Sequence, residues 1–372
     1  MKNILIVMRD LRIGSGVVSC IMNYYSNITA QYNISFLLLD DIDSKYKNIV
    51  LKNKQNIFYL PKSKIKYSLK GKKFLDNLFE ENHFDIIHVN IPGPYGSWIL
   101  KQAKKHNVKN RIYHCHCPKD TSSLKAKISS NIFTNKCINN ANKYIACSSF
   151  AGDDIFKNKK YEILLNCIDI NKFKYCNNKK VRNFHNISSQ EVVIGTVGRM
   201  EIEKNPYFIV DLCVCLKEQN ILFKFLWVGN GTLKNKIMDY ARKKNVLDLI
   251  IFAGVQSDIT SYYSAMDIFI LPSFFEGLGL VLIEAQSNGL ICLTSTNVPS
   301  DTKITNNIHY LPLDNLKEWA NKINELTKKI PSSDERLMLV HEVEKSKYNL
   351  KNSEDNLSSI YKSCFKEGDN YE

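Results

Sequence analysis

One stretch, Leu271 to Gly289 (LPSFFEGLGLVLIEAQSNG), limits the possible folds of this chain more than any other. It begins at the end of an apolar run, 267–271, which predicts a buried strand. Two glycines then allow the backbone to come close to a ligand. The pattern at 280–286 predicts a helix that Gly289 is well placed to end. A strand, a glycine loop and a helix in this order are typical of a parallel α/β sheet with a ligand at the carboxyl end of the strand.

Two carboxylates lie in this stretch, eight residues apart. Glu276 falls in the loop and Glu284 on the helix, so they flank a helix N-terminus whose free N–H groups favour hydroxyl oxygens or anions. By spacing alone, such a pair is more often a solvated loop acid and a helix-face acid. The glycines between the two acids, the buried strand before them and a basic pair upstream favour a site for a polyol and a phosphate.

The basic pair is Arg199 and Lys204, five residues apart. These two residues lie between a buried run at 192–198 and a helix that is expected to begin at Asn205 and Pro206. Two cations in a strand-to-helix loop suit a diphosphate, because the guanidinium binds as a fork and the ammonium as a point charge. The alternative is a pair of exposed basic residues without a ligand.

A second glycine loop follows the first apolar run, Ile4 to Met8. It contains Gly14, Ser15 and Gly16, and a helical pattern begins at Val17. This order of strand, loop and helix brings backbone N–H groups up to a phosphate. It is not a dinucleotide fingerprint, because a third glycine is missing at the required place.

Two further strand ends carry polar residues. Asn90 to Trp98, with two prolines and two glycines, is predicted to be a loop at the carboxyl end of a strand, where open α/β sheets bind ligands. The run at 111–116 predicts a strand with His114 and His116 on the same side. Each histidine is either a satisfied polar group or a group that hydrogen-bonds a sugar hydroxyl or a phosphate.

The rest of the chain continues the alternation of apolar runs and helical patterns. Strands are expected at 35–39, 57–60, 85–89, 144–149, 223–228, 250–254, 291–295 and 308–311, and helices at 62–82, 151–156, 315–329 and 334–363. The chain has 372 residues, enough for two domains. We expect an α/β protein with an N-terminal domain at 1–176, a polar linker at 177–190 and a second domain at 191–344.

These motifs together resemble the retaining, nucleotide-sugar-dependent glycosyltransferases of the GT-B fold, in the family-four-like group and its polysaccharide-biosynthesis branch. Glu276 and Glu284 match the E-x7-E motif of that family, and GRMEIEKNP matches its R-x4-K diphosphate pair. The sequence IGSGVVSCIMNYYSNI is similar to the first loop and helix of such enzymes. LLNCIDI resembles their NGID turn, with Cys167 in place of the usual glycine.

The resemblance implies a GT-B architecture of two doubly wound, Rossmann-like domains that face a cleft. The acceptor would bind the first domain, the nucleotide sugar the second, and the last helix, about 345–372, would pack back on the first domain. The catalytic residues that it implies are Glu276, Arg199, Lys204 and His116. The other donor-binding positions would be Gly14, Gly16, Phe252, Gly254, Gly277, Leu278, Gly279, Leu280 and Glu284, and the acceptor-side positions Ser15, His114, Pro92 and Asn166.

Each implied role follows from the chemistry of the donor. Arg199 and Lys204 would hold its diphosphate, Glu284 would accept hydrogen bonds from the ribose hydroxyls, and Glu276 would accept them from the sugar ring. His116 would lie near the donor sugar. No metal and no other cofactor is expected, because the two cations take the place of a metal ion.

The resemblance also implies a reaction. We expect transfer of a sugar from a nucleotide sugar, a UDP-sugar first of all, to a polyprenyl-diphosphate-linked saccharide, with retention of anomeric configuration. This step would belong to the synthesis of a capsule, an exopolysaccharide or an O-antigen. Two alternatives stay open: a sugar-nucleotide epimerase of the same fold, and a nonenzymatic protein that binds a nucleotide sugar.

Charge is unevenly distributed along the chain. Residues 1–190 hold 31 Lys and Arg against 13 Asp and Glu, whereas residues 191–372 hold 20 against 24. The basic half suggests an anionic target such as the inner membrane surface or a diphosphate-linked lipid, although a solvated Lys-rich face explains it too. Nucleic acid is not expected as a partner, because no recognition motif accompanies the lysines. The best candidates for a membrane-facing surface are Lys62, Lys64, Lys66, Lys70, Lys72 and Lys73.

The cysteines and the apolar runs indicate the cellular compartment of the protein. The 11 cysteines are scattered without a disulfide framework, which favours a reducing compartment. No apolar run approaches the length of a membrane span, and the first run is too short for a signal peptide. We therefore expect a cytoplasmic protein that is peripheral at the inner face of the cell membrane.

Overall fold

The chain forms two compact units. The computed structural model describes residues 1–13, 15–62, 68–119, 123–177, 179–353 and 355–366. The first unit consists of Met1–Cys167 together with the C-terminal segment from Ser353, and the second unit is Ile168–Asn352. The segment 177–190, for which the sequence predicts a linker, contains a short helix, and its Val181 and Ile187 are buried in the core of the second unit.

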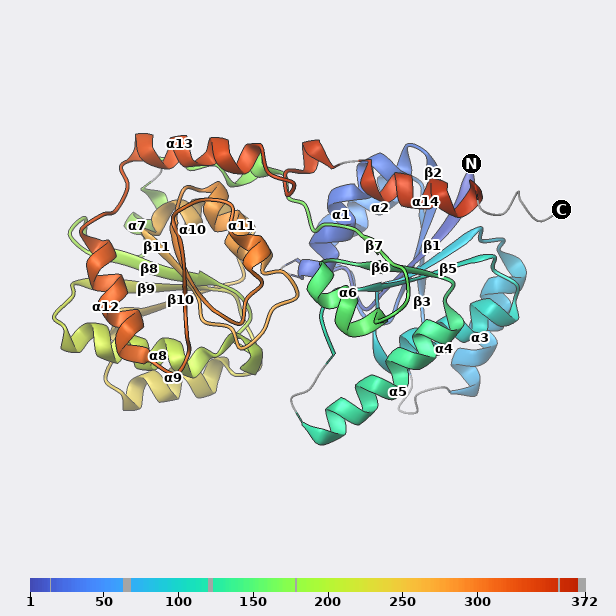
Figure 1. Ribbon diagram of the computed structural model, residues 1–372, viewed down its shortest axis with the longest axis horizontal. Helices are drawn as coiled ribbons and strands as arrows, with labels where there is room; N and C mark the ends of the chain where they lie inside the picture. The colour runs from blue at the N-terminus through green and yellow to red at the C-terminus, as the bar shows by residue number, and fades with distance from the viewer. Residues whose placement is uncertain (14, 63–67, 120–122, 178, 354, 367–372) are drawn as a thin grey trace. The chain divides into compact units, whose positions relative to one another are not determined.

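The first unit is built on a parallel sheet. Its strands are β1 (Lys2–Met8), β2 (Tyr32–Leu38), β3 (Asn56–Tyr59), β4 (Ile86–Val89), β5 (Asn110–Cys115), β6 (Lys143–Ala146) and β7 (Glu162–Ile163). Its helices are α1 (Gly16–Thr29), α2 (Ser44–Lys52), α3 (Leu69–Glu81), α4 (Gly93–Lys105), α5 (Leu124–Asn140), α6 (Ser149–Phe156) and α14 (Asn356–Lys366). Figure 1 shows α1 and α14 on one face of this sheet and α3 and α4 on the other. The central strands are buried because helices cover both faces.

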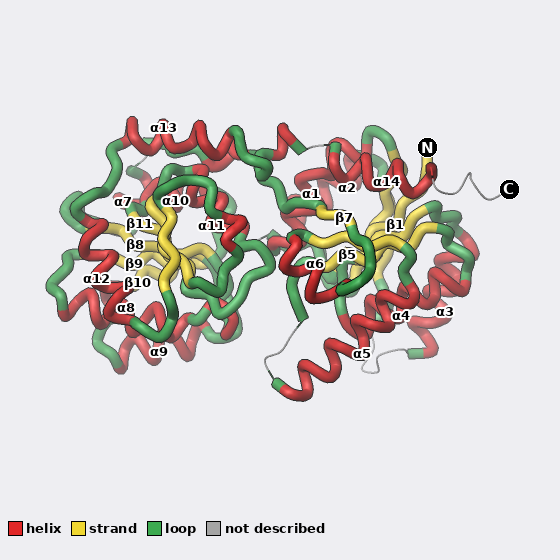
Figure 2. The backbone as a smooth tube through the Cα atoms, in the orientation of Figure 1, coloured by secondary structure: helices red, strands yellow, loops and turns green. Residues whose placement is uncertain are grey.

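The second unit has the same plan. Its strands are β8 (Val192–Val197), β9 (Phe223–Val228), β10 (Ile250–Gly254), β11 (Ile268–Leu271), β12 (Ile291–Ser295) and β13 (Ile308–Leu311). Its helices are α7 (Lys180–Phe184), α8 (Pro206–Glu218), α9 (Lys234–Lys243), α10 (Ile259–Ala265), α11 (Leu280–Ser287), α12 (Leu316–Thr327) and α13 (Ser333–Glu344). Figure 2 shows the strands of each unit as a layer flanked by helices.

The strand order defines where each unit can bind a ligand. Within the described residues, the first sheet runs β3-β2-β1-β4-β5-β6-β7 and the second β10-β9-β8-β11-β12-β13, with every pair parallel. Each order reverses direction once, between β1 and β4 and between β8 and β11. Ligands of open α/β sheets bind outside the carboxyl ends of the strands at such a point. The predicted fold class, two doubly wound parallel sheets, is confirmed.

One prediction of local structure is wrong at the end of β4. The segment Asn90 to Trp98 is predicted to be a loop, but α4 begins at Gly93, with Pro92 as its N-cap residue. Prolines suit a first helical turn because the N–H groups there have no partner within the helix. Gly96 lets the helix start close to the strand, since a Cβ atom there would lie 1.9 Å from the Ile91 carbonyl oxygen.

The single helix predicted at 334–363 is also wrong. The chain leaves the helical path after α13, which ends at Glu344, and resumes it in α14 at Asn356. The side chains of Asn349 and Asn352 donate hydrogen bonds to the Glu344 carbonyl oxygen, at 2.8 Å and 3.1 Å. They satisfy a group that would otherwise be unpaired at the helix end. The helix α14 belongs to the first unit, where Leu357 is fully buried.

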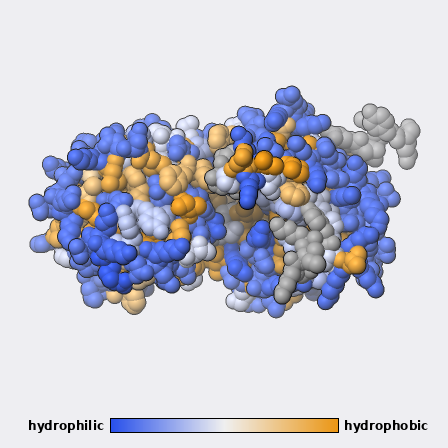
Figure 3. Space-filling model, turned by 90° about the horizontal axis from the view of Figure 1, so that it is seen from below, coloured by the Kyte–Doolittle hydropathy of each residue, from blue (hydrophilic) through white to orange (hydrophobic). Residues whose placement is uncertain are grey.

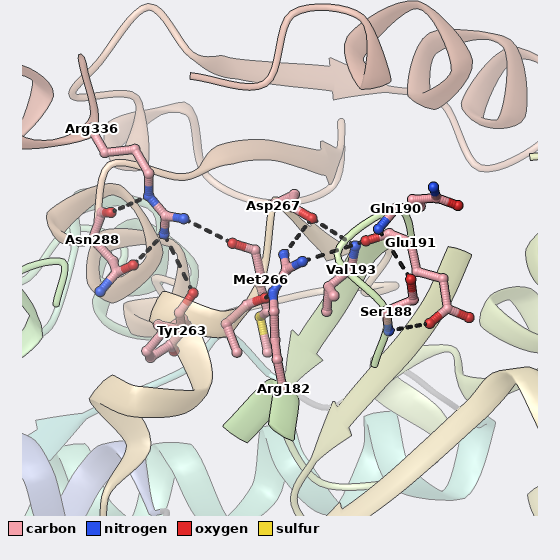
Figure 4. Close-up of polar contacts among 11 residues, drawn as sticks. Arg182, Ser188, Gln190, Glu191, Val193, Tyr263, Met266, Asp267, Asn288 and Arg336 are labelled. Carbon is pink, nitrogen blue, oxygen red and sulfur yellow. Dashed lines mark hydrogen bonds and ion pairs between the residues drawn. The ribbon is translucent and has the colours of Figure 1, made fainter. Parts of the chain in front are cut away.

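A buried arginine fastens α13 to the rest of the second unit (Figure 4). Arg336 is 5% exposed and donates to the carbonyl oxygens of Asn288 (3.1 Å), Met266 (2.9 Å) and Tyr263 (3.4 Å). A further bond reaches the Asn288 side chain, and the guanidinium lies 4.2 Å from the ring centroid of Tyr175. Because α13 packs against α11, these bonds help to hold α11 in place.

We predict that Arg336→Met lowers the free energy of unfolding by about 3–5 kcal/mol, because several buried acceptors lose their donor at once. Denaturant titration followed by circular dichroism measures this loss. Arg242→Met is the matched control: Arg242 is exposed and pairs with Asp239 three residues away, so its removal should change stability by less than about 0.5 kcal/mol. Equal effects of the two substitutions would contradict the anchoring role.

Candidate active site

The loop after β11 is held by buried hydrogen bonds. Ser273 is fully buried, and its carbonyl oxygen accepts a bond of 2.6 Å from the Ser295 hydroxyl on β12. The backbone N–H of Phe274 donates to the Glu203 carbonyl oxygen at 2.9 Å, which joins this loop to the loop after β8. Gly279 caps α11 with φ of 85°, a conformation that favours glycine. The helix therefore begins where the sequence predicts it.

The loops after β8 and β11 meet in an ion pair. Lys204 Nζ lies 2.5 Å from Glu276 Oε1, and the two side chains are 20% and 11% exposed. The Ser273 hydroxyl donates to the same Oε1 at 2.6 Å. Both bonds end on one carboxylate oxygen, so the other oxygen can accept a hydrogen bond from a ligand hydroxyl. An ammonium and a carboxylate are thus presented together at the switch point of the sheet.

Arg199 takes a different partner from Lys204. Its guanidinium donates to Glu203 Oε1 at 3.1 Å, and its side chain is 66% exposed. An exposed pair of this kind contributes little to stability. The side chain is therefore free to turn toward an anionic ligand at low cost. The two predicted phosphate-binding cations lie in the same loop, but only Lys204 contacts a predicted site carboxylate.

Glu284 lies on α11 beside a buried tyrosine that the sequence did not single out. The Tyr263 hydroxyl donates to Glu284 Oε2 at 2.7 Å. Burial disfavours the carboxylate and raises the pKa of Glu284 to about 7, although the bond from Tyr263 acts in the opposite direction. The side chain is partly exposed, so it can still reach a ligand. Tyr263 lies in the short helix α10, and nothing in the sequence of that helix links it to Glu284.

The end of β9 approaches the loop of Arg199 closely, and the end of β10 bonds to that of β9. Gly229 has φ of 137°, and a Cβ atom there would lie 2.2 Å from the Gly198 carbonyl oxygen. Its N–H donates to the Gly254 carbonyl oxygen at 2.8 Å. Gly254 has φ of 70° with open space where a side chain would be. Phe252, predicted to lie at the nucleobase, stacks on Trp227 with ring centroids 6.1 Å apart.

The remaining donor positions surround the start of α11. Leu278 and Leu280 are buried, and Gly277 is partly buried. The backbone N–H groups of Leu278 and Leu280 lie at the start of α11, where the first N–H groups of a helix have no intrahelical partner. The backbone of this segment rather than its side chains is therefore suited to contact a ligand.

The candidate residues of the first unit follow β1, β4 and β5. Ser15 caps α1 by accepting a bond of 3.5 Å from the Val18 N–H, and Gly16 begins the helix. Pro92 is exposed at the start of α4. Asn166 is 6% exposed. Gly14, the other glycine of the first loop, lies outside the described residues.

His114 and His116 lie at the carboxyl end of β5 within a longer row of polar side chains. His114 Nδ1 lies 3.2 Å from His88 Nε2, and His116 Nε2 lies 2.8 Å from Asn90 Oδ1. Burial lowers the pKa of both histidines, to about 3 for His116 and well below the ordinary value for His114. Both rings are therefore neutral near pH 7. Sequence reasoning missed His88 and Asn90, although both follow the face alternation of β4.

Among the described residues, no group of three or more His, Cys, Asp or Glu side chains could hold a metal ion. In the same part of the chain, no helix is long and apolar enough to cross a membrane.

Solved structures place the fold in a known class. The chain is similar to the Anabaena protein HepE in complex with UDP and glucose, with a TM-score of 0.79, 15% identity and coverage of 98% of this chain and 100% of that one. It is also similar to the sucrose-phosphate synthase of Thermosynechococcus elongatus, with a TM-score of 0.78, 16% identity and coverage of 98% and 99%. The two doubly wound sheets thus define a protein of the GT-B class.

Sequence comparisons then define the family. The model of glycosyl transferases group 1 matches residues 177–337, and that of glycosyltransferase family 4 matches residues 15–172. Together the two matches span most of the chain, which therefore belongs to this family of glycosyltransferases. The resemblance drawn from the E-x7-E and R-x4-K motifs is confirmed at the level of the family.

Three curated relatives illustrate the similarity. The putative glycosyltransferase EpsF of Bacillus subtilis is 27% identical over 310 residues, which cover 80% of each chain. The UDP-Gal:α-D-GlcNAc-diphosphoundecaprenol α-1,3-galactosyltransferase of Escherichia coli is 30% identical over 164 residues, 43% of this chain and 41% of that protein. A third relative, the capsular polysaccharide biosynthesis glycosyltransferase CapM of Staphylococcus aureus, is 30% identical over 166 residues, 43% of each chain.

We predict a pH-dependent contribution of Glu284 to stability. The pKa of Glu284 in the folded chain, about 7, lies above its ordinary value of 4.5, so the protonated carboxyl stabilises the fold below pH 4.5. That contribution is lost as the pH rises through about 7. Relative to Glu284→Gln, the natural protein should lose on the order of 1–3 kcal/mol of unfolding free energy between pH 5 and pH 8.

Denaturant midpoints at the two pH values measure this difference. The exposed Glu218 provides the control, since Glu218→Gln should leave the pH profile of stability unchanged. A profile of Glu284→Gln that runs parallel to that of the natural protein would show that Glu284 titrates at an ordinary pKa.

Proposed function

We propose that this chain transfers a sugar from a nucleotide sugar to a lipid-linked saccharide with retention of anomeric configuration. Among nucleotide sugars, we propose a UDP-sugar as the donor. The reaction would be one step in the synthesis of a capsule, an exopolysaccharide or an O-antigen. The observation that carries the proposal is the ion pair between Lys204 and Glu276 at the carboxyl edge of β8 and β11. The acceptor class is supported by the Escherichia coli relative, a galactosyltransferase named for its α-D-GlcNAc-diphosphoundecaprenol acceptor.

The cations would act on the leaving group. When the bond between the anomeric carbon and the diphosphate oxygen breaks, that oxygen gains negative charge. Lys204, which Glu276 holds in place, would lie beside this oxygen, and the exposed Arg199 would turn toward it. The N–H groups at the start of α11 add positive potential at the same edge. Charges placed in advance stabilise the transition state without reorganisation.

The carboxylates would fix the geometry of the donor. Glu276 would accept a hydrogen bond from a sugar hydroxyl through the oxygen that Lys204 and Ser273 leave open. Glu284 would accept from the ribose hydroxyls. Both acids bind rather than attack, so hydrolysis by two opposed carboxylates does not follow from this pair. The acceptor hydroxyl would attack on the face that the diphosphate leaves, and a phosphate oxygen would take its proton.

No metal ion or other cofactor enters this proposal. The donor diphosphate is neutralised by Arg199, Lys204 and helix amides, which fill the role that Mg²⁺ has in many phosphate sites. Addition of a chelator should therefore leave turnover unchanged.

The epimerase alternative predicts a different product, because an epimerase would form an altered nucleotide sugar without any acceptor.

A lipid-linked acceptor also calls for contact with a membrane, and α5 offers a surface suited to it. Its exposed apolar side chains repeat every four residues, at Leu124 (75%), Ile128 (52%) and Ile132 (47%). Figure 3, which views the side where α5 lies, shows hydrophobic side chains within a mostly hydrophilic surface. Neither α4 nor α5 contains an acidic residue, and their exposed lysines are Lys101, Lys104, Lys105, Lys125, Lys127 and Lys136. Apolar and basic groups on one helix pair favour an anionic lipid surface.

The lysine segment predicted to face the membrane is only partly described. Lys70, Lys72 and Lys73 are exposed on α3, and Lys62 is exposed before it. Lys64 and Lys66 lie outside the described residues. We propose the membrane contact for α5 in the first place, because it adds an apolar row to the positive charge.

The donor site can be tested with a panel of nucleotide sugars read by thermal shift. A donor at about a hundred times its Kd should stabilise the natural protein by about 2.7 kcal/mol. Lys204→Ala and Glu276→Ala should abolish the shift and the turnover of that donor. Lys236→Ala and Glu218→Ala, which remove exposed charges of the second unit, should keep both. The proposal fails if the two site variants turn over the donor as well as the natural protein does.

The membrane surface can be tested by sedimentation with vesicles that contain phosphatidylglycerol. Replacement of Leu124, Ile128 and Ile132 by Ser should reduce binding at least tenfold, and added salt should weaken what remains. A matched control replaces Leu337 and Met338, which are 45% and 69% exposed on α13, by Ser. Equal binding of the two variants would exclude α5 as the docking surface.

A further inference from the structure

A row of polar side chains crosses the core of the first unit from α14 to the carboxyl edge of the sheet. Tyr361 Oη lies 2.8 Å from His88 Nδ1, and His88 Nε2 lies 3.2 Å from His114 Nδ1. The ring of His114 in turn lies against that of His116, tilted by 39° and with ring centroids 3.9 Å apart. Tyr361 and His88 are fully buried and His114 is 1% exposed. Such a row costs desolvation energy unless each member has a definite partner.

Tyr361 determines which ring nitrogen of His88 carries the proton. Burial raises the pKa of Tyr361 well above its ordinary value, so the phenol keeps its proton. A buried O–H that finds no acceptor is costly, and the acceptor placed before it is His88 Nδ1. Burial also lowers the pKa of His88 to about 3, so the ring is neutral and carries one proton. With Nδ1 accepting, that proton is on Nε2 and points at His114 Nδ1.

The same reasoning determines which ring nitrogen of His114 carries the proton. Because His114 Nδ1 accepts from His88, the single proton of the neutral His114 ring is on Nε2. That nitrogen is buried and has no hydrogen-bond partner among the described residues. His114 therefore presents an unused N–H donor.

The tautomer of His116 is determined by its hydrogen bond to Asn90. The Asn90 amide Nδ2 donates to the His88 carbonyl oxygen at 3.3 Å, which turns Asn90 Oδ1 toward His116. Oδ1 can only accept, so His116 Nε2, at 2.8 Å, carries the proton. His116 Nδ1 is then a bare acceptor, and it too is buried without a partner among the described residues.

A donor and an acceptor thus remain on two rings in contact. A hydroxyl can accept from one nitrogen and donate to the other at once. A carboxylate or phosphate could only accept, and an ammonium could only donate. The pattern therefore fits a hydroxyl and discriminates against an ion of either sign.

We propose that Tyr361 and His88 are positioning residues, which hold His114 as a donor beside the acceptor nitrogen of His116 so that the two rings bind one hydroxyl of the acceptor saccharide. This inference rests on the proposed function for the identity of the sugar, but the orientation of the rings does not. Both nitrogens are covered, so the hydroxyl enters when the side chains over them move. The C-terminal helix thereby determines the hydrogen-bonding character of a site at the far end of β5.

Nuclear magnetic resonance of the 15N-histidine-labelled full chain tests the orientation directly. Long-range 15N–1H correlations should show His88, His114 and His116 all protonated on Nε2. Tyr361→Phe removes the donor without a large change in volume, and the Nδ1–H form of His88 and His114 should then become populated. Tyr32→Phe is the matched control: Tyr32 packs edge-on against Tyr361 and donates to the Ser358 carbonyl oxygen, but it bonds no histidine. A His114 ring protonated on Nδ1 in the natural protein, or one unaffected by Tyr361→Phe, overturns the proposal.

Kinetics with a donor identified by thermal shift and N-acetylglucosaminyl-diphosphoundecaprenol as acceptor tests the ligand. Tyr361→Phe and His114→Ala should raise the acceptor KM about tenfold, the effect of one lost hydrogen bond, while the Kd of the donor stays the same. Unchanged acceptor KM with the expected ring protonation would mean that the pair holds a water, which overturns the sugar assignment. Failure of the proposed function would give a different result. No nucleotide sugar would then bind, but the NMR spectra would still show the expected protonation of the three histidines.

Discussion

The ion pair between Lys204 and Glu276 is the interaction on which the proposed donor site depends. It joins the loops after β8 and β11, the two strands at which the order of the second sheet reverses. Without Glu276, the half-buried ammonium would have no counter-ion, and without Lys204 the carboxylate would lose part of its support. The pair also explains why the glycines and the buried Ser273 surround it, since the loops must approach each other closely to bring these two side chains together.

Much of the fold was predictable from the sequence, because buried parallel strands are continuous apolar runs. The bounds of β9, β12 and β13 agree with the runs at 223–228, 291–295 and 308–311. The two wrong predictions of local structure arose where the local composition is typical of a different structure. The prolines and glycines after β4 belong to the first turns of α4, and the asparagines after α13 end a helix that its periodicity would continue.

The candidate site was predictable only in part. Motif spacing was enough to propose Lys204, Glu276 and Glu284, since the family motif fixes these positions in the sequence. It could not identify Tyr263, which bonds Glu284, nor Tyr361 and His88, which align His114. These partners are distant in sequence and have the composition of ordinary core residues. Only the packing of the chain brings their polar atoms to the acids and histidines of the site.

The return of α14 to the first unit has a consequence for biosynthesis. The second unit, Ile168–Asn352, leaves the ribosome as one continuous stretch, so it can fold as soon as it is made. The first unit begins before it in the sequence but lacks Tyr361 until the whole second unit has emerged. During that interval His88 has no phenol to accept from, and the face of the sheet under α14 stays uncovered. The half of the protein that is translated first is thus the half that is completed last.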